Sequence, residues 1–208
     1  MNDRTEKPKL VIFDLGNVVI RIDWQPMFDI WSKASGVPAK DLQLRFQFDE
    51  NYEGFERGQL TARDYHACVC RLLGAVIPYP KFLEGWNAIF QDTVQGIGEL
   101  LTQLKDKVRV VAFTNSNEVH HQVWRKKYED VLTHFHHIFI SSEMGLRKPD
   151  AESFKHILSH FAMEPRETLF FDDLLPNVDA ARRLGIHAVL VESLESVRST
   201  LTRLWFLD

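Results

Sequence analysis

The feature that most constrains the fold is a set of five apolar runs, each four to six residues long, set among stretches with helical periodicity. Apolar runs of this length are typical of strands buried on both faces of a sheet. The runs are residues 9–13, 108–113, 137–140, 168–171 and 187–191, and helical stretches precede the last four at residues 94–104, 118–128, 151–161 and 177–184. Strands that alternate with helices indicate parallel pairing through helical crossovers. We therefore predict an α/β protein with a doubly wound, Rossmann-like parallel sheet.

A long segment after the first strand interrupts this alternation. Helical apolar spacing recurs in residues 24–35, 41–48, 61–73 and 80–90, and we expect no strand between the first strand and residue 94. The prediction is an inserted helical cap over residues 23–91. The α/β core then consists of residues 1–22 and 92–208 and ends with an amphipathic helix over residues 193–206.

Charge and hydropathy exclude several classes of partner. The chain has 25 Lys and Arg against 29 Asp and Glu, a net charge of −4, so it lacks the basic excess that binds nucleic acid. No apolar run approaches the roughly 20 residues of a membrane helix, and the charged residues 1–9 lack the apolar region of a signal peptide. We expect a cytoplasmic protein without nucleic-acid or membrane partners. The oligomeric state stays open.

Polar side chains follow the ends of several predicted strands. Asp14 follows the first strand, Thr114 the second, and Asp172 and Asp173 the fourth, whereas Lys148 lies shortly after the third. In an open parallel sheet, reacting groups gather outside the carboxyl ends of the strands, because helices cover both faces. This placement predicts a single site at that edge of the sheet.

The carboxylates of this set suit phosphoryl chemistry. A carboxylate at position 14 can attack phosphorus or carbon and form a covalent aspartyl intermediate, although an Asp that caps a turn would look the same in isolation. Asp172 and Asp173 repel each other unless they share a cation or a proton, and Mg²⁺ is the hard cation that fits such oxygen ligands. The sequence therefore predicts a nucleophile beside a metal site.

The remaining members could bind a phosphoryl group. Lys148 offers a compact positive charge, and Thr114 and Asn115 offer hydrogen-bond donors. A Thr-Asn pair after a strand is by itself only a turn signal. Together with the carboxylates, however, these residues complete a nucleophile, metal, cation and donor set.

Four motifs carry these residues in order: Asp14 in FDLGNV, Thr114 in FTNSN, Lys148 in GLRKPD, and Asp172 with Asp173 in FFDDLLPN. With these motifs the chain resembles the haloacid dehalogenase-like superfamily over nearly its whole length, including the cap. The wording of the motifs is most similar to the sugar-phosphate branch that resembles alpha-D-glucose-1-phosphate phosphatases.

The resemblance implies a role for each motif residue. Asp14 is implied as nucleophile and metal ligand, and the backbone carbonyl of Gly16 as a second ligand. Asp173 is implied as a direct ligand, with Asp172 nearer the water shell. The implied phosphoryl-binding residues are Thr114, Asn115 and Lys148.

One position departs from the pattern. Many phosphatases of this superfamily carry an Asp two residues after the nucleophile as general acid and base, and Gly16 stands there instead. Losing a general acid typically costs about 10² to 10⁴-fold in rate. Asp23 is our candidate substitute, because a hairpin could fold its carboxylate back over Asp14. The alternative is that Asp23 only caps the helix that begins near Trp24.

The function predicted is a Mg²⁺-dependent phosphatase that acts on a small phosphorylated metabolite, such as the sugar phosphate glucose 1-phosphate, through an aspartyl-phosphate. Three alternatives remain. A 2-haloacid dehalogenase would use the same nucleophile on carbon without a metal. A receiver domain has similar residues, but its acidic pair precedes the phosphorylated Asp in a shorter chain. A catalytically silent binding protein could retain the fold.

Overall fold

The computed structural model describes residues 7–204, 206 and 207 of the chain. Its central sheet has five parallel strands in the order β5-β4-β1-β6-β7. These are β1 (Leu10–Phe13), β4 (Arg109–Thr114), β5 (His137–Ile140), β6 (Thr168–Asp172) and β7 (His187–Leu190). The predicted parallel α/β sheet is confirmed, with strand ends within one residue of those expected. Residues 1–6, 205 and 208 of the predicted core lie outside the described residues.

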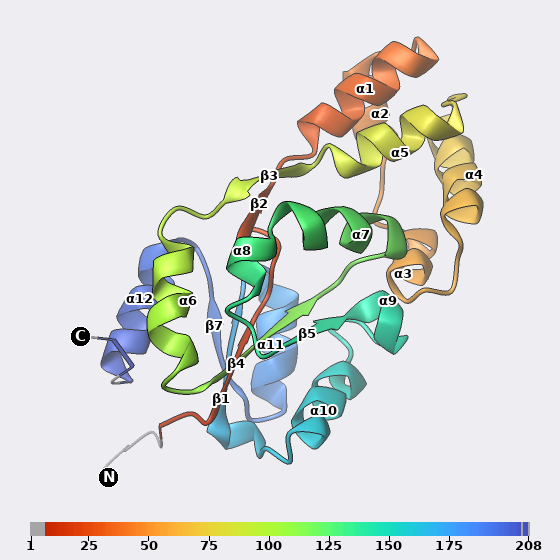
Figure 1. Cartoon of the computed structure of the whole chain (residues 1–208). Coiled ribbons are helices and arrows are strands. Elements are labelled where there is room, and N and C mark those ends of the chain that lie inside the picture. Colours follow the sequence, from red (N-terminus) through yellow and green to blue (C-terminus); the bar gives the residue numbers. More distant parts are fainter. Residues whose placement is uncertain (1–6, 205, 208) are drawn as a thin grey trace.

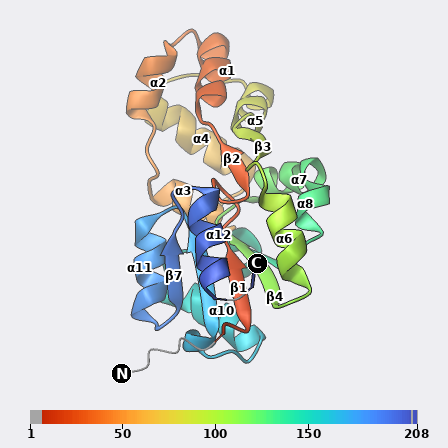
Figure 2. The ribbon, with the colours of Figure 1, turned by 90° about the vertical axis from the view of Figure 1, so that its left-hand side faces the viewer.

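Helices cover both faces of the sheet, which explains why its strands are apolar on both sides (Figures 1 and 2). On one face α10 (Ala151–His160) and α11 (Leu175–Arg183) pack against alternate residues such as Ile12. On the other, α6 (Ile97–Lys105), α8 (Glu129–Leu132) and α12 (Leu194–Arg203) pack against Phe13 and its neighbours. The elements α7 (Glu118–Lys127), α9 (Ser141–Met144) and η1 (Pro165–Glu167) lie in the connections.

The inserted segment forms a helical cap beyond the carboxyl ends of the strands (Figure 1). Its helices are α1 (Gln25–Ser35), α2 (Ala39–Arg45), α3 (Glu50–Glu56), α4 (Ala62–Leu73) and α5 (Tyr79–Asn87). Helix α3, of 7 residues, was not predicted; it begins where the Asp49 carboxylate accepts a hydrogen bond from the Tyr52 N–H at 2.9 Å. The second helix was predicted to run to residue 48, whereas α2 ends at Arg45.

A short antiparallel ribbon joins the cap to the core, and here the prediction of no strand was wrong. Strand β2 (Ile20–Ile22) pairs with β3 (Phe90–Thr93), so both connections between cap and core run through the ribbon. Strands of three and four residues that pair across about 70 residues give no local periodicity. The predicted boundary between residues 22 and 23 falls at the end of β2, and the one between residues 91 and 92 falls within β3.

Stacked aromatic rings fill the cap interior. The rings of Trp31 and Trp86 are nearly parallel, with centroids 6.1 Å apart, and the Phe82 ring lies 5.5 Å from that of Trp31. Gly85 permits this approach, because a Cβ at that position would lie 2.4 Å from the indole nitrogen of Trp31. A substitution of Gly85 would therefore push the stacked rings apart.

The cap also contacts the core through a buried histidine. The His120 ring of α7 stacks on Trp86 at 4.7 Å, and its Nε2 lies 2.9 Å from the Trp86 carbonyl oxygen. The Nδ1 atom lies 3.2 Å from the side-chain amide of Asn117. Burial lowers the pKa of His120 to about 3, although the hydrogen bond to Trp86 opposes the shift. The folded chain therefore holds a neutral imidazole here.

Acid should destabilise the fold through this residue. Below pH 6.5 this histidine is protonated in the unfolded chain, whereas it stays neutral in the folded chain. The free energy of unfolding therefore falls as the pH falls from 6.5 towards 3, and above pH 6.5 this residue does not change it. At pH 5 the loss is about 2 kcal/mol. We expect the difference in unfolding free energy between the wild type and His120→Gln to shrink by that amount between pH 7 and pH 5 in urea titrations. If this difference in unfolding free energy were the same at both pH values, the loss of stability in acid would come from other groups, because those are present in both proteins.

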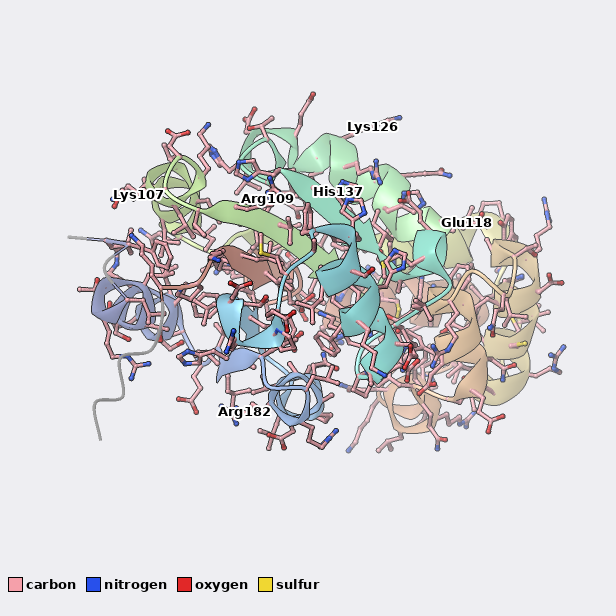
Figure 3. The ribbon with its side chains drawn as sticks, turned by 90° about the horizontal axis from the view of Figure 1, so that it is seen from below. Lys107, Arg109, Glu118, Lys126, His137 and Arg182 are labelled. Carbon is pink, nitrogen blue, oxygen red and sulfur yellow. The ribbon has the colours of Figure 1, made fainter. Side chains whose placement is uncertain are left out.

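The opposite end of the sheet carries different side chains. Figure 3 views the molecule from below, towards the amino ends of the strands, where Arg109 and His137 begin β4 and β5. The acidic groups predicted to act together follow the other ends of the strands. Among the described residues, no helix combines the length and apolar character that crossing a membrane requires.

Candidate active site

Asp14 lies at the carboxyl edge of the sheet, directly after the central strand. Its backbone N–H donates to the Phe171 carbonyl of β6 at 2.8 Å, which continues the strand pairing by one step. The side chain, almost wholly buried, accepts from the Lys148 ammonium, with Nζ 2.7 Å from Oδ1. Because β1 lies between β4 and β6, the ends of these three strands bring Asp14, Thr114 and Asp172 to one place.

Lys148 is the buried cation of the site. Its ammonium lies 2.7 Å from Asp14 Oδ1 and from Asp172 Oδ2, and 2.9 Å from the Phe113 carbonyl oxygen. These three acceptors use all three of its N–H bonds. Burial alone would lower the pKa of Lys148, but Asp14 and Asp172 outweigh burial and raise it. Lys148 is therefore charged, and binding a phosphoryl oxygen, as predicted, would require it to exchange a protein partner.

Asn115 positions this lysine. The Asn115 side-chain amide donates to the Lys148 carbonyl oxygen at 2.9 Å, and its oxygen accepts from the Lys148 backbone N–H at 2.9 Å. The following Lys148-Pro149 peptide bond is cis. The side chain of Asn115 thus fixes the loop that delivers the cation, which leaves its backbone and the Thr114 hydroxyl for the predicted phosphoryl contacts.

The two adjacent carboxylates have different surroundings. Asp172 is fully buried and accepts from the Leu174 N–H at 2.8 Å and from the Asn177 amide at 3.0 and 3.1 Å, in addition to Lys148. Asp173 is more exposed and accepts from the Asn17 amide at 3.1 Å. Asp172, with more hydrogen-bond donors around it, binds the lysine, and Asp173 lines the cavity. Their implied outer and direct metal roles stay predictions.

The carboxylates fit a divalent cation. One oxygen each of Asp14, Asp172 and Asp173 lies within 4.8 Å of the others, the only such group of three among the residues that the structure describes. Burial, with a contribution from the other two carboxylates, raises the pKa of Asp14 to about 7 against the opposing effect of Lys148. Burial likewise raises the pKa of Asp173. Clustered negative charge that one ammonium does not balance is the environment that a hard cation stabilises.

The predicted backbone ligand and acid/base residue differ in their placement. The Gly16 carbonyl oxygen accepts from the Val18 N–H at 2.7 Å and retains a second lone pair for a metal. The Asp23 carboxylate accepts from the Gln25 N–H at 2.9 Å at the start of α1, and Asp23 does not line either cavity at the site. The structure therefore places the Asp23 carboxylate against the backbone at the start of α1, and its acid/base role stays a prediction.

A cavity of about 410 Å³ opens over these groups, between core and cap. Besides the predicted residues, it is lined by Asn17, Ile22, Trp24, Phe48, Tyr52, Glu56, Arg147, Leu174 and Asn177. A smaller cavity of about 90 Å³ adjoins it under the β2/β3 ribbon. The sequence did not assign these residues to the site, and four of them, Trp24, Phe48, Tyr52 and Glu56, reach the cavity only through the docking of the cap.

An ion-pair group fixes one side of this cavity. Arg147, next to Lys148, binds Glu56 of α3 with Nη2 2.9 Å from Oε2, and Glu53 with Nη1 3.1 Å from Oε1. Burial raises the pKa of Glu56, and Arg147 opposes that shift. The pairing joins the cap to the loop that carries Lys148.

Comparison with known proteins identifies the family. A model of the haloacid dehalogenase-like hydrolases matches residues 8–185. The chain belongs to the haloacid dehalogenase-like hydrolases. This hydrolase is 34% identical over 187 residues to a sesquiterpene phosphatase of Aspergillus oryzae, which covers 86% of this chain and 87% of that protein. It is 22% identical over 200 residues to a D-ribitol-5-phosphate phosphatase of Bacteroides thetaiotaomicron, with 93% and 97% covered.

A solved structure agrees with the fold of this hydrolase. An enzyme of the same family from Bacteroides thetaiotaomicron, in complex with magnesium and inorganic phosphate, superposes with a TM-score of 0.76 at 26% identity. The match covers 89% of this chain and 95% of that one. The predicted superfamily is thereby confirmed, whereas the resemblance to glucose-1-phosphate phosphatases stays a prediction.

Proposed function

We propose that the chain is a Mg²⁺-dependent phosphatase that hydrolyses a phosphate monoester through an aspartyl-phosphate at Asp14. The observation that carries the proposal is the buried cluster in which Asp14 meets Lys148 and two further carboxylates below the cavity between core and cap. Phosphatases among the relatives, and the magnesium and phosphate bound by the related enzyme, support it.

Residues of the site can carry out both the formation and the hydrolysis of the aspartyl-phosphate. An Asp14 carboxylate oxygen attacks phosphorus, the Asp14–phosphorus bond forms, and the bond to the alcohol oxygen breaks. A water then attacks the same phosphorus and the Asp14–phosphorus bond breaks, which releases inorganic phosphate and restores the Asp14 carboxylate. The proton that the water loses balances, through solvent, the one that the departed alkoxide takes up. Lys148 orients Asp14 and offsets its charge, and the Thr114 hydroxyl donates to the phosphoryl oxygens. Mg²⁺, when bound by Asp14, Asp173 and the Gly16 carbonyl, would neutralise charge on the phosphoryl group.

The absence of a side chain at position 16 bears on the leaving group. A Cβ at Gly16 would lie 3.6 Å from Ile22 and 3.7 Å from Asp14 Oδ2, which are ordinary contact distances. Packing therefore does not require glycine, and the space above Asp14 remains open to the substrate. Without a proton donor at this position, alcohols that leave readily as alkoxides should be favoured.

Metal removal tests this function. Three carboxylates and one ammonium leave a net charge of about −2 that would repel a phosphate dianion. We expect EDTA to reduce phosphate release from p-nitrophenyl phosphate by about 100-fold or more, and excess Mg²⁺ to restore it. Turnover that survives EDTA would contradict the proposal. Chelator-insensitive halide release from 2-chloropropionate would instead support the dehalogenase, and ligand binding without any turnover would support the silent binding protein.

The alcohol portion of the substrate is not set by the relatives. A sesquiterpene and D-ribitol 5-phosphate are chemically unlike, although the phosphatases named for them both resemble this chain. Glucose 1-phosphate, the choice of the sequence analysis, and a cytoplasmic location both stay predictions. The lining of the cavity is the remaining evidence on the substrate.

A further inference from the structure

We propose that the substrate is the phosphate monoester of an apolar alcohol, whose hydrocarbon chain lies against a wall formed by Ile22, Trp24, Phe48, Tyr52 and Leu174. We call these residues the apolar wall. All five line the cavity that contains Asp14 and Lys148. The inference rests on the proposed phosphatase function and names the class of alcohol.

The charged and amide side chains of the cavity already form hydrogen bonds or ion pairs within the protein. Glu56 is bound by Arg147 and by the Tyr52 hydroxyl. The other pairs, described above, are Asn17 with Asp173, Asn177 with Asp172, and Asn115 with the Lys148 backbone. The Asn17 side-chain oxygen also accepts from the Ile22 N–H at 3.0 Å.

These existing hydrogen bonds and ion pairs disfavour a sugar phosphate as the substrate. A site selects a polyol by presenting free donors and acceptors to its hydroxyl groups, and a hydroxyl that enters without a partner loses its hydrogen bonds to water. Here every amide or charged group already uses part of its hydrogen-bonding capacity on a protein partner, which leaves fewer donors and acceptors for the hydroxyl groups of a sugar. A hydrocarbon chain needs none of them.

Two exposed apolar side chains stand at the rim of the cavity. Phe48, in the cap segment between α2 and α3, has 59% of its surface exposed, and Leu174, directly after Asp173, has 54% exposed. The Phe48 ring packs edge-on against Trp24 at 5.4 Å and against Tyr52 at 4.8 Å. The apolar wall therefore reaches the surface from both the cap and the core. A bound chain would cover both side chains, and that burial favours binding.

The apolar lining also continues inward. The smaller cavity shares Ile22, Trp24 and Tyr52 with the larger one, and its further lining includes Ile89, Phe90 and Trp124. Both cavities also share Thr114, the predicted phosphoryl contact. The phosphate end of the site is thus surrounded by hydrocarbon surface on more than one side.

A homologous series of esters tests the proposal. We would measure kcat/KM with Mg²⁺ for ethyl, butyl, hexyl and octyl phosphate, below their micelle concentrations, and for glucose 1-phosphate, ribitol 5-phosphate and p-nitrophenyl phosphate. The expected result is a rise of about two- to fourfold per methylene until the wall is covered. Ribitol 5-phosphate, a primary alkyl ester like the series, should fall at or below ethyl phosphate, and glucose 1-phosphate, whose anomeric oxygen leaves more readily, should still fall below octyl phosphate. A flat series or a preference for a sugar phosphate would overturn the inference while leaving phosphatase activity intact. Failure to hydrolyse any ester would instead overturn the proposed function.

Surface variants localise the effect. Phe48→Ser should reduce the octyl-to-ethyl ratio of kcat/KM by about tenfold, because it removes one apolar ring from the wall. The matched control is Leu44→Ser, at a cap residue 73% exposed and outside both cavities. It should leave the ratio unchanged. Since both side chains are exposed, neither substitution should unfold the chain. Equal ratios in the two variants would contradict the placement of the chain along the apolar wall.

Discussion

Replacing Asp14 with Asn is expected to reduce phosphate release by about 10⁴-fold or more, the scale seen when a nucleophile is removed. The neutral amide cannot form the acyl phosphate, yet its oxygen can still accept the hydrogen bond from Lys148. Because burial raises the pKa of Asp14, the native carboxylate is costly to keep charged, so the variant should fold at least as stably as the wild type in EDTA. Phosphate release and thermal unfolding, measured on the same preparation, check both parts.

Asp23→Asn is the matched control for this variant. It makes the same chemical change, but its amide oxygen can still accept the Gln25 N–H that the structure assigns to Asp23. We expect turnover to be unaffected, including for esters with poor leaving groups. A loss that grows with the pKa of the leaving alcohol would return Asp23 to the acid/base role that the sequence first suggested. Asp14→Asn with near-native turnover would rule out the aspartyl-phosphate.

The parts of the site that lie on the sheet could be predicted from the sequence. Asp14, Thr114 and Asp172 follow apolar runs that are each recognisable alone, and parallel pairing brings the ends of such runs to one edge. The order of the strands was not needed for this step. That is why the carboxylate cluster could be named before its geometry was known.

The remaining parts depend on long-range packing. The β2/β3 ribbon pairs segments about 70 residues apart, and the Arg147 contact with Glu56 spans 91 positions. No local pattern marks either one. Asp23 shows the limit of local patterns, because a carboxylate before a helix predicts a cap as readily as a catalytic acid. The structure adds its contact with the Gln25 N–H, and the Asp23→Asn variant tests the acid/base role.

The second large effect should come from Lys148→Met. We expect kcat/KM to fall by about 10³-fold, because the variant loses the charge that orients Asp14 and stabilises the phosphoryl group. Removing one partner of a buried ion pair typically costs about 3–5 kcal/mol, since the other charge is left without compensation. Here Asp14 and Asp172 would both lose their ammonium at 2.7 Å. The unfolding free energy in EDTA should therefore fall by an amount of that order.

Lys155→Met is the matched control, because it removes a lysine from an ion pair that is exposed and not buried. Lys155 also binds a carboxylate at 2.7 Å, that of Glu152, but both side chains are more than half exposed. An exposed pair contributes about 0–1 kcal/mol, so this variant should change neither stability nor turnover appreciably. Mg²⁺ should recover part of the stability lost in Lys148→Met, because it would neutralise the same carboxylates, and it should not affect Lys155→Met. If the two variants were equally stable in EDTA, the lysine would not be the counter-ion that holds the cluster together.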